Sequence, residues 1–108
     1  LNRNYLHMKE IFDSVSRHCS RITTRAYSTS FSLGIRCLEK ELRNPVYAIY
    51  GFVRFADEIV DTFHEYDKQT LLNRFKEDTY TAIAEKISLN PILNSFQETV
   101  NRYDIDRE

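Results

Sequence analysis

The sequence predicts an all-α protein. Only two glycines and two prolines occur in 108 residues, so there are few of the turn signals that separate short strands. In several long segments apolar residues recur at steps of three and four, the spacing of one face of a helix. No segment alternates apolar and polar residues as a half-buried strand would, and there is no internal repeat. We expect one domain with five helices.

The composition excludes several classes of protein. Hydrophobic residues make up 42% and charged residues 29% of the chain, which is typical of a folded, globular protein. A net charge of -1 without a basic stripe gives no reason to expect a nucleic-acid partner. No apolar run approaches membrane-spanning length, and no signal-peptide pattern opens the chain. Cys19 and Cys37 are too few and too isolated for a disulfide framework or a zinc site, so we expect a reducing, cytoplasmic location.

The first two helices are expected on either side of a segment rich in hydroxyl groups. An amphipathic stripe predicts a helix over residues 5–24, and the stripe consists of Tyr5, Met8, Ile11, Phe12, Val15, Cys19 and Ile22. Ser and Thr side chains then compete for backbone hydrogen bonds, which predicts a break near residues 27–30 and a short helix to about residue 42. The native start, Leu1 or Met8, is left open.

Two Asn-Pro pairs mark further helix starts. Asn suits the N-cap and Pro suits the first helical position, so Asn44-Pro45 predicts a helix over residues 45–64 and Asn90-Pro91 predicts one over residues 91–103. Apolar spacing predicts a helix between them, over about residues 68–87. The sequence pattern alone leaves open whether these five helices form a complete domain or part of a larger bundle.

The helix over residues 45–64 carries four polar residues on one side. Tyr50, Arg54, Asp57 and Asp61 fall within roughly 60° of each other on a helical wheel, and we call them the polar ribbon. A solvated face would explain them, with an ordinary ion pair from Arg54 to Asp57 or Glu58 worth ~0.3 kcal/mol. However, Asp is a poor helix former, and apolar residues flank the ribbon closely on both sides. We therefore favour a functional interpretation.

The polar ribbon suits a diphosphate held through a metal ion. Mg²⁺ is commonly bound through one or two carboxylates together with substrate phosphates, which Asp57 and Asp61 could supply. The planar guanidinium of Arg54 suits phosphate, and Tyr50 offers a hydroxyl group and an aromatic face.

The preceding segment could form a second wall of the same site. Ser28 and Ser30 could donate hydrogen bonds to phosphate, and Phe31 could line an apolar tunnel for the rest of the ligand. Each also has a structural explanation: a cap or turn for the serines, the core for Phe31, and packing at the rim for Tyr27.

Three segments resemble the squalene/phytoene synthase family, and most nearly the bacterial phytoene and dehydrosqualene synthases. In chain order they are "YSTSF", "NPVYAIYGFVRFADEIVDTF" and "ISLNPILNSFQETVNRY". The resemblance runs from about residue 8. Its most specific element is Y-x-x-x-R-x-x-D-x-x-x-D. It implies an all-α isoprenoid synthase bundle that joins two prenyl diphosphates, farnesyl or geranylgeranyl, head to head. The implied products are phytoene, dehydrosqualene or squalene, in carotenoid or triterpenoid biosynthesis.

The resemblance also implies a role for each residue. Asp57 and Asp61 would be the first aspartate-rich motif and bind Mg²⁺, while Arg54 and Tyr50 would contact the diphosphate or shape the site of the cation. The remaining substrate-binding positions would be Tyr27, Ser28, Thr29, Ser30 and Phe31. Glu58 would have a lesser, supporting role. The resemblance to the bacterial enzymes favours no cofactor beyond Mg²⁺, but it leaves open whether a nicotinamide cofactor reduces the product. The water-insoluble product implies work at a membrane surface.

The chain departs from the family in lacking a second aspartate-rich helix. Asp104 and Asp106 are two residues apart and lie on opposite sides of any helix. We therefore expect residues 1–108 to be the N-terminal part of one synthase domain, inactive alone and self-associating through exposed apolar faces. The alternative is a non-catalytic helical binding or assembly module that keeps the synthase-like first half.

Overall fold

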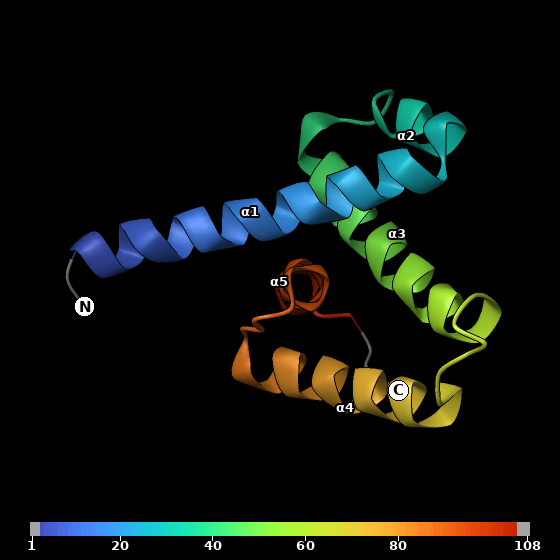
Figure 1. Ribbon diagram of the computed structural model, residues 1–108. Helices are drawn as coiled ribbons and strands as arrows, with labels where there is room; N and C mark the ends of the chain where they lie inside the picture. The colour runs from blue at the N-terminus through green and yellow to red at the C-terminus, as the bar shows by residue number, and fades with distance from the viewer. Residues whose placement is uncertain (1–2, 106–108) are drawn as a thin grey trace.

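Five helices and their connecting turns make up residues 3–105, the part of the chain that the computed structural model describes (Figure 1). The helices are α1 (Arg3–Tyr27), α2 (Thr29–Ile35), α3 (Lys40–Asp61), α4 (Lys68–Glu85) and α5 (Pro91–Tyr103). No strand occurs in these residues. The predicted all-α class and the number of helices are therefore confirmed.

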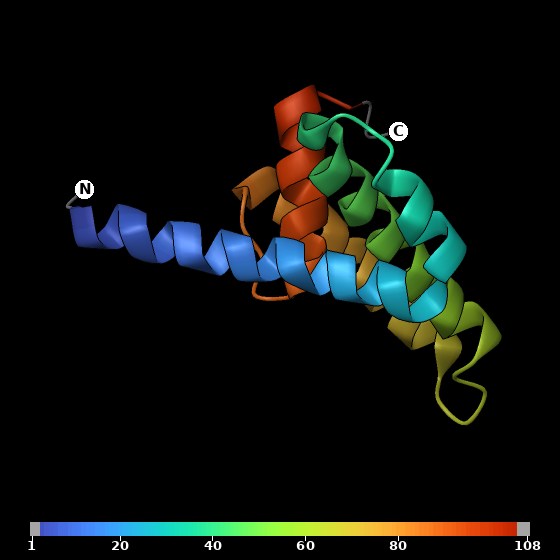
Figure 2. The same cartoon turned by 90° about the horizontal axis from the view of Figure 1, so that it is seen from above.

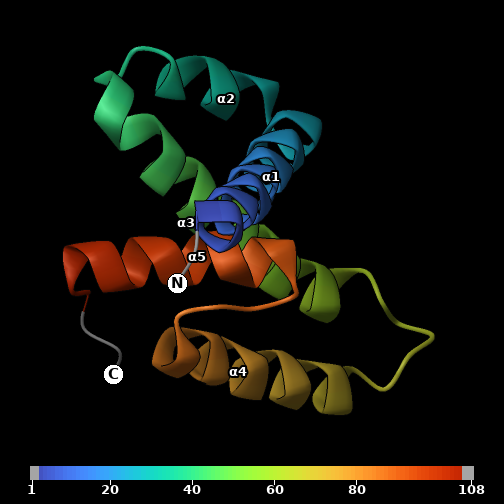
Figure 3. The same ribbon diagram turned by 90° about the vertical axis from the view of Figure 1, so that its left-hand side faces the viewer.

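Helix α5 lies at the centre of the bundle. Figure 1 looks almost along its axis, with α1 above it and α4 below it, and α3 packs against both α1 and α5. Figure 3 shows α5 and α4 running side by side. Since α5 has neighbours on several sides, it is buried around most of its circumference. Its buried residues are Ile92, Leu93, Asn94, Ser95, Gln97, Thr99 and Val100.

An aromatic stack joins α3, α4 and α5. The ring of Phe52 on α3 lies 3.8 Å from that of Phe96 on α5 and 5.3 Å from that of Phe75 on α4, measured between centroids. Both pairs are stacked, with interplanar angles of 9° and 23°. All three rings are partly buried, and stacked aromatic pairs of this kind stabilise the contact between helices beyond the area they bury.

Helix α1 packs through small polar residues and leaves its apolar stripe exposed. Ser16, Ser20 and Thr24 are buried, and a Cβ added at Gly51 on α3 would lie only 3.5 Å from Ser20. The stripe that predicted this helix lies elsewhere: Met8 is 61% and Val15 is 53% exposed. Figure 2 shows the N-terminal half of α1 extending beyond the other helices, so nothing in the described chain covers it.

The hydroxyl-rich segment breaks the helix where expected, at Ser28. Thr23 and Thr24 do not end α1, because their hydroxyls donate to the carbonyls of Cys19 and Ser20 in the preceding turn. Ser28 is the N-cap of α2, and its Oγ accepts a hydrogen bond from the backbone N–H of Phe31 at 3.1 Å. Helix α1 therefore ends at Tyr27, and the cap at Ser28 stabilises the first turn of α2.

The two Asn-Pro pairs behave differently. Asn90 caps α5 as predicted, and its Oδ1 accepts from the N–H groups of Ile92 and Leu93. The predicted start at Pro45 was wrong, because α3 begins at Lys40 and contains Pro45 within its first two turns.

Helix α2 accordingly ends at Ile35 rather than near residue 42. The turn at residues 36–39 closes α2, and helical hydrogen bonding resumes before Asn44. A proline close to a helix start removes only one backbone donor, so the short segment ahead of it remains helical. Helices α3 and α4 also end two to three residues earlier than expected, at Asp61 and Glu85.

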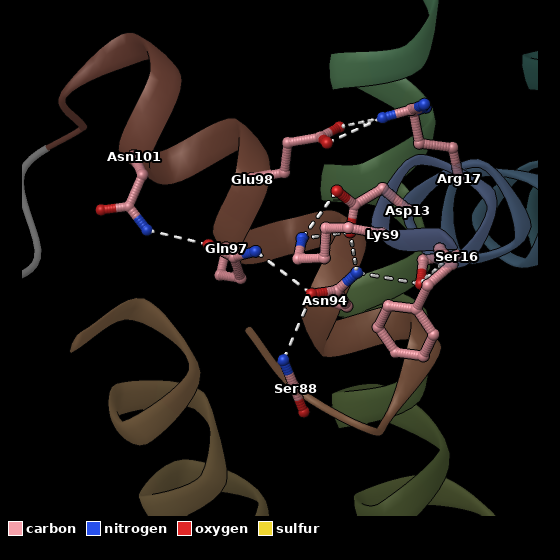
Figure 4. A network of polar contacts seen from close by, with 10 residues as sticks. Lys9, Asp13, Ser16, Arg17, Ser88, Asn94, Gln97, Glu98 and Asn101 are labelled. Atoms are coloured by element: carbon pink, nitrogen blue, oxygen red, sulfur yellow. Dashed lines mark hydrogen bonds and ion pairs between the residues drawn. The ribbon is translucent and has the colours of Figure 1, made fainter. Parts of the chain in front are cut away.

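A buried amide ties α5 to α1 (Figure 4). Asn94 is 1% exposed, and its Nδ2 donates to Asp13 Oδ1 at 2.9 Å and to Ser16 Oγ at 3.0 Å. Its Oδ1 accepts from the Ser88 N–H and from Gln97 Nε2, both at 3.2 Å. The side chain thus makes hydrogen bonds to a helix, to a turn and to its own helix.

Electrostatic contacts reinforce this junction. Arg17 on α1 pairs with Glu98 on α5 at 2.7 Å, and Lys9 pairs with Asp13 at 2.7 Å. Partial burial alone would raise the pKa of Asp13, but hydrogen bonds from Lys9 and Asn94 outweigh it and lower that pKa. Asp13 therefore stays ionised and keeps accepting from Asn94.

Replacing Asn94 should destabilise the whole bundle. Asn94→Ala leaves the buried groups around it without a partner, so the free energy of unfolding should fall by about 2–3 kcal/mol, measured by urea denaturation. Asn73→Ala is the matched control, because Asn73 is an exposed asparagine whose contact is with Gln69 on its own helix. An equal loss in both variants would contradict the role of the buried amide.

Candidate functional site

The hydroxyl-rich segment and the polar ribbon lie next to each other. The ring of Phe31 on α2 stacks on Tyr50 of α3, with centroids 5.0 Å apart. The guanidinium of Arg54 lies over the ring of Tyr27, 4.9 Å from its centroid. These two contacts join the break between α1 and α2 to two successive turns of α3. The structure therefore brings together two sets of residues that the sequence indicated separately.

Arg54 is held by a carboxylate as well as by an aromatic ring. Its Nη2 lies 2.9 Å from Glu58 Oε1, one turn further along α3, and the two side chains are only 24% and 15% exposed. The phenol of Tyr27 also lies near Glu58, close enough for this carboxylate to affect its pKa. Partial desolvation, followed by the nearby charge of Glu58, raises the pKa of Tyr27, although Arg54 opposes the shift. The phenol therefore stays protonated and can donate to the carboxylate.

The two aspartates of the ribbon are exposed and make no hydrogen bond or ion pair within residues 3–105. Asp57 lies in the last two turns of α3, and Asp61 is its final residue. A carboxylate at a helix C-terminus is unfavourable because the helix dipole is negative there. The last turn of α3 contains no basic residue, and the ammonium of Lys68, which meets this turn, donates to the carbonyl of Val60 and not to an aspartate. Both carboxylates thus keep their full capacity to bind a cation.

The three hydroxyl residues at the break have different surroundings. Ser28 serves as the cap of α2, as the structural interpretation expected. Thr29 lines a separate cavity with Arg25, Ser32, Leu33 and Arg36, and no residue of the polar ribbon lines that cavity. Ser30 is exposed. Only Tyr27 and Phe31 of this segment touch ribbon side chains in the contacts described above.

An apolar cavity of about 390 Å³ lies between α3 and α4, on the other side of α3 from the aspartates. It is lined by Tyr27, Phe55, Glu58, Ile59, Phe63, Leu71, Arg74, Phe75, Asp78 and Asn90. Asp57 and Asp61 do not line it. We expected both aspartates to face an enclosed cavity, and the described residues do not build one there: α1 and α2 reach the ribbon only at Arg54 and Tyr50, and both aspartates are exposed.

The carboxylates of the ribbon fit a hard cation only as part of a larger set. Within residues 3–105 no three His, Cys, Asp or Glu side chains are grouped closely enough to hold a metal ion. Two free carboxylates one turn apart match the way Mg²⁺ is bound, through one or two protein oxygens plus phosphate and water. Asp104 lies after the end of α5, and Asp106 lies outside the described residues.

The comparison with protein families identifies the chain's relatives. A family model described as squalene/phytoene synthase matches residues 24–108. The chain belongs to this family. The match begins in the last turns of α1, later than the resemblance from about residue 8, and it contains the whole polar ribbon and the break at Ser28. Neither the curated proteins nor the solved structures gave a match.

The family assignment agrees with the all-α fold. Squalene/phytoene synthases have the helical isoprenoid synthase architecture, and the five helices are consistent with part of it. No described helix has both the length and the hydropathy needed to cross a membrane.

Sequence reasoning left open whether Arg54 would pair with Asp57 or with Glu58, and the structure shows the pair with Glu58. It placed Glu58 beside the ribbon in a supporting role. The available signal was the four-residue spacing, which allows an Arg and a Glu to meet on one helix face. What the sequence could not supply was Tyr27, which is brought to this pair by the packing of α1 against α3.

The negative charge of Asp61 at the C-terminus of α3 should lower the stability of the folded chain. Asp61→Asn removes a negative charge at the C-terminus of α3, so the free energy of unfolding should rise by about 0.3–1 kcal/mol, measured by urea denaturation at low salt. Glu41 lies in the first turn of the same helix, where a carboxylate is favourable, so Glu41→Gln should lower stability. Loss of stability in Asp61→Asn would mean that Asp61 has a structural partner.

Proposed function

We propose that this chain supplies one metal-binding wall of an enzyme that joins two prenyl diphosphates head to head. The observation that carries the proposal is a pair of unpartnered aspartates, one turn apart, beside a held arginine on a helix of a squalene/phytoene synthase chain. A negative charge is disfavoured at the C-terminal end of a helix, where Asp61 lies, and a residue that breaks a local rule in this way is expected at a functional site.

Asp57 and Asp61 would hold Mg²⁺ together with the diphosphate of the substrate. The ion would neutralise the charge that develops on the leaving diphosphate when the bond to the prenyl group breaks. Arg54 supports the same step, because a guanidinium close to the leaving oxygens stabilises their negative charge. Ser28 and Ser30 remain candidates for hydrogen bonds to the diphosphate, with Thr29 beside them.

The aromatic residues next to the ribbon would protect the allylic cation. The stacked rings of Phe31 and Tyr50 present apolar surface beside the phosphate-binding residues and would keep water from the cation. Aromatic faces also attract positive charge. The double bond of the second prenyl diphosphate would then attack the cation, and loss of a proton would close a cyclopropyl diphosphate. Departure of its diphosphate, rearrangement and loss of a second proton would give dehydrosqualene or phytoene, whereas squalene would also require a hydride donor.

The proposal requires a second set of carboxylates that faces α3. We infer that residues 1–108 are the N-terminal part of one synthase domain, in which a further aspartate-rich helix covers the exposed side of α3. The substrate would be farnesyl or geranylgeranyl diphosphate, and the product dehydrosqualene, squalene or phytoene, for triterpenoid or carotenoid biosynthesis. Resemblance to the bacterial enzymes favours no cofactor beyond Mg²⁺, and an insoluble product favours a cytoplasmic enzyme at the membrane surface.

Turnover distinguishes the enzyme from a non-catalytic helical module. In the protein that contains this chain with a second aspartate-rich helix, Asp57→Ala or Asp61→Ala should abolish product from farnesyl or geranylgeranyl diphosphate with Mg²⁺. The 108-residue chain alone should form no product under the same conditions. Asp67→Ala is the control, since Asp67 caps α4 away from the ribbon. Normal turnover in the Asp57 or Asp61 variant would reject the proposed site, and no turnover in the unmodified protein would favour the module.

The exposed side of α3 should make the 108-residue chain self-associate. Ile49, Val53 and Val60 share one face of α3 and are 40%, 47% and 52% exposed, and uncovered apolar surface of this kind favours association. Sedimentation equilibrium should therefore detect a dimer, which Val53→Lys weakens. Leu89→Lys is the control, because Leu89 is an isolated exposed leucine on the turn before α5. A monomer at high concentration would contradict this prediction.

A further inference from the structure

Two residues outside the metal-binding pair hold Arg54 in place. We propose that Glu58 and Tyr27 are positioning residues, which fix the Arg54 guanidinium beside Asp57 and Asp61 so that its remaining nitrogens meet a diphosphate. This inference rests on the proposed function. It gives Glu58 a role distinct from that of a third metal ligand, although Glu58 lies next to Asp57 in the sequence.

The ion pair of Arg54 and Glu58 is the least exposed of those in the described chain. Its side chains are 24% and 15% exposed, compared with 32% and 34% for Arg17 and Glu98. Low exposure strengthens the attraction between the charges, since less water screens it. It also restricts a long side chain that would otherwise sample many rotamers. The carboxylate of Glu58 is therefore committed to Arg54.

Tyr27 completes the support from a different helix. Its ring lies against the guanidinium, 4.9 Å from ring centroid to Cζ, and Tyr27 and Glu58 line the same cavity between α3 and α4. One residue at the end of α1 thus lies beside both members of the pair on α3. Because α1 is anchored to α5 by Asn94, the position of Tyr27 is set by the fold and not by a flexible loop.

The arrangement leaves part of the guanidinium available. Nη2 donates to Glu58, whereas Nε is buried and has no hydrogen-bond partner, and no contact within residues 3–105 occupies Nη1. A buried donor without an acceptor is costly. An oxygen of a diphosphate that entered beside Arg54 would accept from Nη1, the nitrogen that no contact in the described residues occupies. Preorganised donors of this kind lower the cost of binding because they are oriented in advance.

Asp57 and Glu58 differ in exposure and in ion pairing, two properties that decide whether a carboxylate is available to a metal ion. Asp57 is exposed and has no partner in the described chain, while Glu58 is partly buried and paired. A Mg²⁺ ion that recruited Glu58 would have to break its contact with Arg54. We therefore assign the metal to Asp57 and Asp61 alone among the residues of α3.

Arginine side-chain NMR tests the positioning role directly in the full 108-residue chain. The Nε–Hε signal of Arg54, assigned from its loss in Arg54→Lys, should be rigid in the unmodified protein. In Glu58→Ala its order parameter should fall below about 0.6, and Tyr27→Phe should produce a smaller fall. Glu98→Gln breaks the pair of Arg17 with Glu98 and should leave the Arg54 signal unchanged. An equally ordered Arg54 in Glu58→Ala would overturn the proposal.

Titration with inorganic diphosphate and Mg²⁺ tests the consequence for binding. Glu58→Ala removes a negative charge, which by itself should strengthen the binding of an anion. The positioning role predicts the opposite, a loss of about tenfold in affinity, with Glu58→Gln retaining part of it. Equal or tighter binding by Glu58→Ala would refute the role of Glu58. The titration uses the protein that contains this chain together with a second aspartate-rich helix. If that unmodified protein binds no diphosphate, the proposed function fails at this site, while the NMR measurement still decides whether Glu58 and Tyr27 position Arg54.

Discussion

The position of α1 depends on the buried amide of Asn94. This side chain has almost no contact with water and hydrogen-bonds to two residues of α1, to the turn before α5 and to Gln97 on its own helix. An apolar residue would fill the same space without fixing the angle or register of α1, because dispersion contacts are not directional. A hydrogen-bonded amide requires one arrangement. The N-terminal helix is thereby held at a defined point along α5.

The candidate site takes its geometry from this junction. From its contact with α5, α1 runs across α3 through Ser20, close to Gly51, and ends at Tyr27, whose ring lies against Arg54. The small side chains along this face allow the two helices to approach closely. The site is therefore formed between rigid helices, which is a more exact support for a phosphate-binding arginine than a loop would be.

The side of α3 that carries the aspartates combines free carboxylates with exposed apolar side chains. One turn of helix presents two free carboxylates, and the neighbouring face presents Ile49, Val53 and Val60 to solvent. The carboxylates repel each other and the apolar groups lose the benefit of burial, so this side contributes little to the stability of the five helices. Both features become favourable when metal, diphosphate and a further apolar wall are present. We propose that catalysis explains their retention.

The sequence by itself determined the fold class, the number of helices and the four residues of the polar ribbon. These follow from local rules: apolar periodicity, the Asn90-Pro91 cap and residue spacing on one helix. The predicted start of α3 was wrong, because Pro45 is the sixth residue of the helix and not the first. An Asn-Pro pair reads the same in the sequence at either position. Only the tertiary structure decided that the small-residue face of α1 is the buried one, that Arg54 pairs with Glu58, and that Tyr27 lies beside both. Contacts between residues distant in sequence depend on how helices cross, and helix crossing is set by packing across the whole bundle.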